Sequence, residues 1–348
     1  MKKVLVTGGC GFVGSTIIRQ LLEQGIEAVG VDLPQLENRF AFKGKARFIG
    51  ADLTDKASLS AKINGGGFDA VLHTAALFKY GAKVEDLHHV NVEGTRNLCD
   101  VMLEKGIKRL VNWSSSTVLG FWDDPKLVKN ETTPINEADI DENYAYSKYK
   151  QEKLGQSYIA KGLEVTTIRP GDIYGPGTPM GLALPMYFFK IGLMRSVPGM
   201  REVFISHVHV DDVAGAAIYL AGQPKAANEI FLLADSRPLS TIETMDVIAK
   251  RFNTWSLPAR NKTFGIPIFH THPAILKLSG LVEEIRAKIK GVYPRFTRQS
   301  ATYSIKNHIL SNNKLLGSGY KLKWPDAALA IPRVIDWYEE NKWAIVKG

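Results

Sequence analysis

Two residues four positions apart could move a proton. Tyr144 and Lys148 stand at i and i+4 of a predicted helix, so their side chains share one face. A free tyrosine, with a pKa of about 10, is a poor base at neutral pH. An ammonium about 4 Å away would stabilise the phenolate by about 4 kcal/mol and bring its pKa near 7. Such a phenol could take a proton from an alcohol. Tyr146 and Lys150 have the same spacing, so spacing alone does not choose between the pairs.

A run of hydroxyl side chains could complete this chemistry. Ser114, Ser115, Ser116 and Thr117 follow the apolar stretch 109–113 directly. Catalytic residues gather at the carboxyl ends of parallel strands, where a hydroxyl can hydrogen-bond a reacting oxygen. The alternative is an ordinary loop that caps a helix.

Three glycines near the N-terminus predict a phosphate site. Gly8, Gly11 and Gly14 lie between an apolar strand pattern and an apolar helix pattern. Glycine lets the backbone approach a pyrophosphate, and the free N–H groups and dipole of a helix N-terminus stabilise its charge. With this context on both sides, the motif predicts dinucleotide binding.

Asp32 favours NAD over NADP as the cofactor. It ends the next apolar run, where a carboxylate accepts hydrogen bonds from the adenosine ribose and repels a 2′-phosphate. Arg39 lies nearby and could meet such a phosphate, which leaves NADP open. The other alternative for Asp32 is a turn cap.

The elements that must position these residues alternate between strand and helix. Strands are expected at 3–7, 27–31, 46–50, 69–73, 109–113, 164–168 and 229–233, and helices at 12–24, 84–104, 144–161, 240–252 and 327–342. This alternation predicts an α/β fold, a Rossmann-type doubly wound parallel sheet. We expect an NAD-binding domain over 1–175. A smaller C-terminal substrate-binding lobe should occupy most of 176–348, with some segments returning to the sheet.

Composition limits the class of protein. The 348 residues are 45% hydrophobic and include only Cys10 and Cys99, which form no metal or disulfide framework. The first strand begins almost at Met1, and no stretch of about 18 apolar residues could span a membrane. We therefore expect a soluble, cytoplasmic protein. The histidines lack further ligands at zinc-binding spacing, so no metal is expected.

The net charge of +9 is concentrated in one segment. Residues 259–323 hold twelve basic residues and two acids, a net charge of +10. The plain interpretation is a solvated basic surface. The alternatives are an anionic substrate or peripheral contact with an anionic membrane. Nucleic acid is not expected, because no recognised nucleic-acid module accompanies the charge.

An ordered series of motifs resembles the extended short-chain dehydrogenase/reductases, the NAD-dependent epimerase/dehydratase and 3β-hydroxysteroid dehydrogenase superfamily. The motifs span nearly the whole chain. They are Thr7 to Gly14, Asp32, Ala51 to Asp55, His73 to Ala76, Asn91 to Thr95, Ser114 to Ser116, Tyr144 to Lys148, Arg169 to Gly177 and His209 to Val213.

The resemblance assigns roles to individual residues. It selects Tyr144 and Lys148 as catalytic, with Ser115 as the active-site hydroxyl and Ser116 as second choice. It also implies a homodimer and a small-molecule substrate. The cofactor-binding residues are predicted to be Gly8, Gly11, Phe12, Val13, Gly14, Asp32, Asp52, Leu53, Thr74, Ala75, Ala76, Asn91, Ser114, Tyr144, Lys148 and Pro170.

The substrate class is less constrained. Members that act on nucleotide-diphosphate sugars carry an arginine four residues before His209, where this chain has Ile205; Arg201 could substitute from a shifted loop. The C-terminal region resembles members similar to 3β-hydroxysteroid dehydrogenase and dihydroflavonol reductase. Apolar stretches at 264–269 and 273–278 are either core, a pocket wall or a membrane-facing surface. We therefore predict an NAD(H)-dependent alcohol dehydrogenase or ketone reductase for a bulky apolar substrate such as a sterol, terpenoid or acyl chain. The alternatives are a nucleotide-sugar epimerase or dehydratase and a non-catalytic NAD sensor or scaffold.

Overall fold

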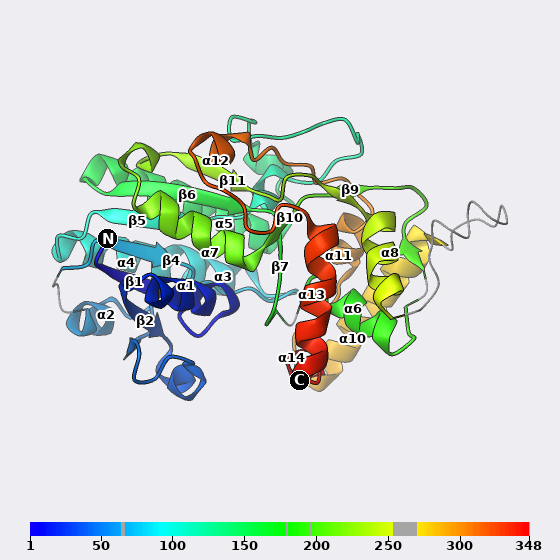
Figure 1. Ribbon diagram of the computed structural model, residues 1–348, viewed down its shortest axis with the longest axis horizontal. Helices are drawn as coiled ribbons and strands as arrows, with labels where there is room; N and C mark the ends of the chain where they lie inside the picture. The colour runs from blue at the N-terminus through cyan, green and yellow to red at the C-terminus, as the bar shows by residue number, and fades with distance from the viewer. Residues whose placement is uncertain (64–66, 179, 195, 253–269, 348) are drawn as a thin grey trace.

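The core of the protein is a seven-stranded parallel sheet (Figure 1). The computed structural model describes residues 1–63, 67–178, 180–194, 196–252 and 270–347. All strand pairs in this sheet are parallel, which confirms the predicted fold class. The order is β11-β6-β5-β4-β1-β2-β3. The strands are β1 (Lys3–Thr7), β2 (Glu27–Asp32), β3 (Arg47–Gly50), β4 (Ala70–His73), β5 (Arg109–Trp113), β6 (Glu164–Pro170) and β11 (Ile230–Leu233).

Helices cover both faces of the sheet, which explains why its strands are nearly continuous apolar runs. On one face, α1 (Phe12–Glu23) and α7 (Val210–Ala221) share an apolar core with Val4, Val6 and Leu72. On the other face, α2 (Lys56–Lys62) and α4 (Gly94–Glu104) enclose Leu5, Val71 and other strand residues. The α5 helix (Asn143–Ser157) packs beside α4.

One predicted helix is interrupted. The stretch 84–104 consists of α3 (Val84–Leu87), a π-helical turn η2 (His88–Glu93) and then α4. Single π-turns occur often at functional sites, and this one carries Asn91.

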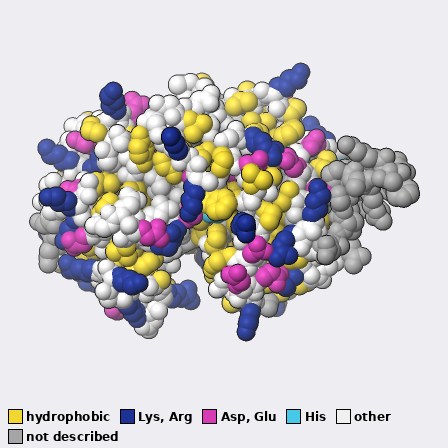
Figure 2. All heavy atoms as spheres, viewed as in Figure 1, with side chains coloured by type: hydrophobic (Ala, Val, Ile, Leu, Met, Phe, Trp, Pro, Cys, Tyr) yellow, Lys and Arg dark blue, Asp and Glu magenta, His cyan; other side chains and the backbone are white. Residues whose placement is uncertain are grey.

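A second group of elements forms what we call the small lobe: α6 (Ala183–Lys190), α8 (Thr241–Arg251), α10 (Pro273–Lys290), α11 (Arg298–Tyr303), α13 (Ala327–Glu340) and α14 (Ala344–Lys347). Met186, Ile248, Ile331 and Trp343 belong to its core. Helix α13 contains Pro332 yet remains one helix. Figure 2 shows a notch between this lobe and the half built on the sheet.

Short pairings connect the two halves. β7 (Asp172–Tyr174) follows β6 and pairs in parallel with β10 (His207–His209), which leads into α7. The remaining short elements are β8 (Val197–Pro198), β9 (Phe204–Ile205), β12 (Leu239–Ser240), β13 (His270–Thr271) and α12 (Asn313–Gly317). The apolar stretch 264–269 lies outside the described residues, whereas 273–278 begins α10.

Candidate active site

The glycine-rich turn is closely packed at two positions where only glycine fits. Gly8 has φ +73° and would place a Cβ 2.8 Å from Thr74 Oγ1. A Cβ on Gly14 would lie 2.1 Å from the carbonyl oxygen of Gly8. The turn is anchored to the next strand, because Gly8 N donates to Val31 O at 2.8 Å. The backbone of the turn therefore approaches the start of α1 closely at Gly8 and Gly14.

The N-terminus of α1 is left without a side-chain cap. Its N-cap residue is Gly11, and the helix begins at Phe12. The hydroxyls of Ser15 and Thr16 instead donate to the Phe12 carbonyl. Uncapped first-turn amides and the positive end of the helix dipole are what a pyrophosphate requires.

The Asp32 side chain hydrogen-bonds to the backbone of the glycine-rich turn. Its Oδ2 accepts from Cys10 N at 2.9 Å, and its Oδ1 accepts from Leu33 N at 2.9 Å. Each carboxylate oxygen can accept a further bond, so a ribose hydroxyl can still be accommodated. Arg39 is exposed at the end of the 3-10 helix η1 (Pro34–Arg39).

The next predicted residues lie along the edges of β3 and β4. Asp52 is exposed and its Oδ1 accepts from Thr54 N at 2.8 Å, whereas Leu53 is buried in the core. Thr74 Oγ1 donates to Thr7 O at 2.7 Å, and Ala75 and Ala76 follow it, half-buried.

Asn91 has a positioning role in the structure. It is fully buried, its Oδ1 accepts from Leu77 N at 2.7 Å, and its Nδ2 donates to Leu77 O and to Ser147 Oγ. The amide thus ties the loop after β4 to α5.

Tyr144 and Lys148 lie on α5, which packs against the turn after β5. Tyr144 is half-buried, and its ring centroid is 4.6 Å from that of Phe78. Burial, with the charges of Glu142 and Tyr80, raises the pKa of Tyr144 above its ordinary value. Lys148 is buried, and its Nζ donates to Gln151 Oε1 at 2.6 Å.

In this arrangement the pKa of Tyr144 is raised, opposite to the direction expected from Lys148. Burial lowers the pKa of Lys148 itself to about 7, so its own charge is partly lost at neutral pH. Its nitrogen bonds to Gln151, whose Nε2 donates to Asn112 Oδ1 at 3.1 Å. Desolvation of the phenol therefore outweighs the expected attraction.

The alternative pair forms a surface cluster. Tyr146 donates from its hydroxyl to Glu137 Oε1 at 3.0 Å, and Lys150 Nζ lies 2.6 Å from the same oxygen. The side chains of Lys150 and Glu137 are 36% and 43% exposed, so this is a surface ion pair with little effect on chemistry.

The three serines after β5 have three different environments. Ser115 is the N-cap of the 3-10 helix η3 (Ser116–Leu119): its Oγ accepts from Thr117 N at 3.2 Å and lies 2.8 Å from Thr117 Oγ1. Ser116 is buried and its Oγ lies 2.8 Å from His308 Nε2. Ser114 Oγ is buried without a partner among the described residues. Ser115, which was predicted as the catalytic hydroxyl, is therefore also the residue that caps the 3-10 helix η3.

With this geometry established, comparison with known proteins identifies the family. Residues 4–234 match the model of the NAD dependent epimerase/dehydratase family. The chain belongs to this family. It is 31% identical over 266 residues to 3 beta-hydroxysteroid dehydrogenase type 7 of Mus musculus, covering 70% of this chain and 71% of that protein. It is 26% identical over 294 residues to UDP-glucose 4-epimerase of Vibrio cholerae, covering 81% and 87%. The crystal structure of gox2253 is 27% identical, with a TM-score of 0.77 over 98% of this chain and 99% of that one.

Family membership confirms three predictions: the family itself, the enzyme class and NAD as cofactor. The residues present fit NAD. The glycine cradle and the uncapped end of α1 suit the pyrophosphate, and the unpartnered Ser114 hydroxyl is a free hydrogen-bonding group. Among the described residues, no cluster of three or more His, Cys, Asp or Glu could hold a metal.

Reasoning from the sequence missed His308. Its Nδ1 lies 3.1 Å from Gly120 O, and a carbonyl only accepts, so Nδ1 carries the proton. Burial lowers the pKa of His308 to about 4, so at pH 7 Nε2 is an acceptor for the Ser116 hydroxyl. His308 therefore clamps both ends of the turn that carries Ser115. No motif marks it, because only the fold brings residue 308 to residue 116.

A buried ion pair was also missed. Arg169 and Glu152 lie 2.6 Å apart with 4% and 0% of their side chains exposed. This pair joins α5 to the end of β6, next to Pro170. Pro170 is buried as the last residue of β6, before the chain crosses toward the small lobe.

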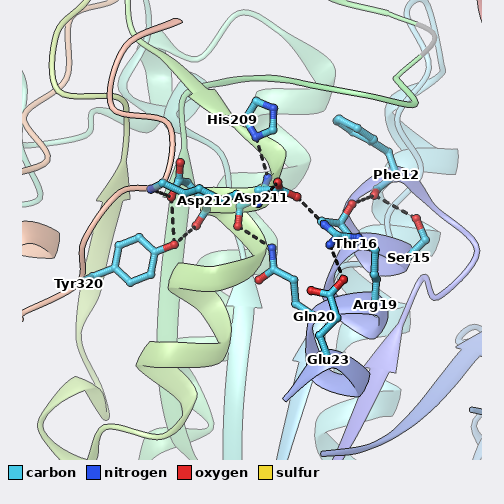
Figure 3. A network of polar contacts seen from close by, with 11 residues as sticks. Phe12, Ser15, Thr16, Arg19, Gln20, Glu23, His209, Asp211, Asp212 and Tyr320 are labelled. Carbon is cyan, nitrogen blue, oxygen red and sulfur yellow. Dashed lines mark hydrogen bonds and ion pairs between the residues drawn. The ribbon is translucent and has the colours of Figure 1, made fainter. Parts of the chain in front are cut away.

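The His209–Val213 motif joins elements far apart in the chain (Figure 3). Arg19 on the cofactor helix lies 2.5 Å from Asp211, and Gln20 donates to the Asp211 carbonyl. Asp212 is buried and accepts from the backbone of Lys323 and Trp324. The motif therefore positions α1 against α7.

A pocket of about 810 Å³ is lined by Tyr80 and Glu142 on one side and by residues of α10 and α11 on the other. Its lining combines aromatic rings, Tyr80, Tyr293 and Tyr303, with an ion pair between Arg298 and Glu284.

Proposed function

We propose that this family member interconverts a secondary alcohol and a ketone on a bulky, largely apolar substrate. NAD, when bound, supplies the hydride acceptor or donor. The predicted catalytic set of Ser115, Tyr144 and Lys148 supports this reaction. Tyr144 and Lys148 lie on α5, which packs against the η3 turn that begins at Ser115.

The three proposed catalytic residues suit different steps of proton transfer. The raised pKa of Tyr144 keeps its phenol protonated, as a proton donor to a ketone oxygen must be. Lys148, with a pKa of about 7, can exchange a proton at neutral pH. The Ser115 hydroxyl can donate a hydrogen bond to the reacting oxygen once it leaves Thr117. In the oxidative direction, positive charge brought near Tyr144 is needed to lower its pKa.

The observation that carries the substrate class is the apolar residue at position 205. The other cation considered, Arg201, is more than half exposed and pairs with Asp123 at the surface. Ile205, at the position where sugar-nucleotide members carry arginine, lies in β9 and bridges to His308. A diphosphate requires charge-assisted bonds, whereas aromatic rings such as Phe121 and Tyr303, stacked at 4.2 Å, suit an apolar substrate.

A second candidate is a nucleotide-diphosphate-sugar epimerase or dehydratase. Relatives with sugar-epimerase names favour it, as do Lys277 and Lys288 on the pocket wall. Two further proposals are a homodimer and peripheral contact with an anionic membrane. The assigned cofactor contacts and the substrate-binding role of the small lobe also stay proposals.

The test compares substrates in one assay. The full chain with NAD is offered sterol and terpenoid secondary alcohols, and NADH formation is followed by absorbance; UDP-glucose and dTDP-glucose are offered in parallel with product analysis. NADH formation with the apolar alcohols alone supports the proposal. Conversion of a nucleotide sugar without net NADH, and no turnover of the alcohols, would replace it with the second candidate.

A further inference from the structure

Helix α10 presents a row of large apolar side chains to solvent. They are between 51% and 81% exposed and recur every three or four residues, so they lie on one helix face. We call this row the α10 stripe: Ile275, Leu278, Val282, Ile285 and Ile289.

The opposite face holds the helix to the protein. Gly280 and Ala287 are its buried residues, and a Cβ on Gly280 would lie 2.6 Å from Thr297 C. This close packing on the start of α11 prevents the helix from rotating its stripe inward. A surface helix of a globular protein normally turns its apolar face to the core; α10 does the reverse.

Uncompensated positive charge accompanies the stripe. The two acids of α10 are paired, Glu283 with Arg286 and Glu284 with Arg298. Lys277, Lys288 and Lys290 have no ion pair within the described part of the chain and are exposed. An apolar face beside free lysines is the pattern of a helix that lies in a membrane interface.

We propose that α10 docks on an anionic lipid surface, with the α10 stripe among the acyl chains and the three lysines at the headgroups. The helix is about 27 Å long at 1.5 Å per residue, and no helix in the described part of the chain is long and apolar enough to cross a membrane. The helix therefore lies along the surface. A second copy seated on the stripe would bring like-charged lysines together, which charge complementarity disfavours.

The docking would serve the pocket described above. Lys277, Ala287 and Lys288 line that pocket from α10, so a lipid-dissolved substrate would be delivered next to Tyr80 and Glu142. This consequence rests on the proposed function; the docking itself does not.

The experiment is cosedimentation of the full chain with phosphatidylcholine vesicles, with or without phosphatidylserine, at low and high salt. We expect binding to the anionic vesicles only, weakened by salt. Leu278→Asn combined with Ile285→Asn should weaken it about tenfold or more, and Lys290→Glu should weaken it at low salt. Leu329, 70% exposed on α13, provides the matched control: Leu329→Asn should bind as the unmutated chain does.

Three results would overturn the docking: no binding to anionic vesicles, equal binding to neutral vesicles, or stripe variants that only convert a dimer to a monomer in analytical ultracentrifugation. Far-ultraviolet circular dichroism checks that each variant is folded. NADH formation is measured in the same samples, so vesicle binding without turnover refutes the proposed function alone, and turnover without vesicle binding refutes the docking alone.

Discussion

The Nζ of Lys148 and the Oε1 of Gln151, three residues apart on α5, are joined by a buried 2.6 Å hydrogen bond. Gln151 is held in turn by Asn112 at the end of β5. The sheet thus positions Lys148, the lysine proposed as catalytic, through the side-chain amide of Gln151.

Changing Gln151 should move the pH profile of turnover in opposite directions for two variants. Gln151→Leu removes an acceptor that favours charged Lys148, so the pKa of Lys148 should fall below about 7. Gln151→Glu supplies a carboxylate and should raise it. The measurement is kcat against pH with the unmutated chain as reference. A purely structural role would lower kcat without moving the inflection.

Tyr144→Phe should reduce turnover about 100-fold or more, the usual effect of removing a general acid–base group. NAD binding, followed by quenching of tryptophan fluorescence, should be retained. Tyr146→Phe is the matched control, since it loses only the part-buried hydrogen bond to Glu137. Should Tyr146→Phe be the inactive variant, the choice between the two pairs is wrong.

Asp32→Ala should weaken NAD binding about tenfold and relax discrimination against NADP. It removes both the charge that repels a 2′-phosphate and the acceptor of Cys10 N. Asp32→Asn keeps the side chain's size and one acceptor, so it separates charge from loop support. Calorimetric titration with both cofactors measures the effect. Equal affinity of the unmutated chain for NAD and NADP would contradict the assignment.

Asp235 should make folding less stable as pH rises. It is buried, and burial raises its pKa from 3.8 to about 8. Between these values the folded state binds the extra proton. The protonation of Asp235 therefore contributes fully to the free energy of unfolding below pH 4. This contribution is lost as the pH rises toward 8, by at most about 1.4 kcal/mol per pH unit.

Asp235→Asn should remove that slope while it keeps an acceptor for His209 N and a partner for Tyr174. Urea unfolding of both proteins at pH 5, 6, 7 and 8 provides the comparison. Parallel stability curves for the two proteins would show that Asp235 titrates normally.

The sequence predicted the sheet well because each strand is a short apolar run bounded by turn residues. A strand was expected at 229–233, and β11 (Ile230–Leu233) pairs there in parallel with β6. Spacing alone did not distinguish Tyr144 from Tyr146 as the catalytic tyrosine, whereas the family motif selected Tyr144. The hydrogen bond from Tyr146 to Glu137 is consistent with that choice.

What could not be predicted depends on tertiary contacts. The raised pKa of Tyr144 comes from its own burial and from the charges of Glu142 and Tyr80, and Lys148 has a buried acceptor that no motif marks. His308 meets Ser116 across 192 positions of sequence. The apolar stretch 273–278 was consistent with core, pocket wall or surface, and only the structure shows that Ile275 and Leu278 face outward while Gly280 packs inward.

The return of β11 to the sheet also governs how the chain can fold and be cut. β6 pairs with β5 on one side and with β11 on the other, and α7 comes from the same late part of the chain. A fragment that stops at residue 175 would leave β6 as a bare sheet edge and uncover α1. Such an edge recruits other chains, so the fragment would aggregate. During synthesis the sheet therefore stays incomplete until residue 233 has left the ribosome.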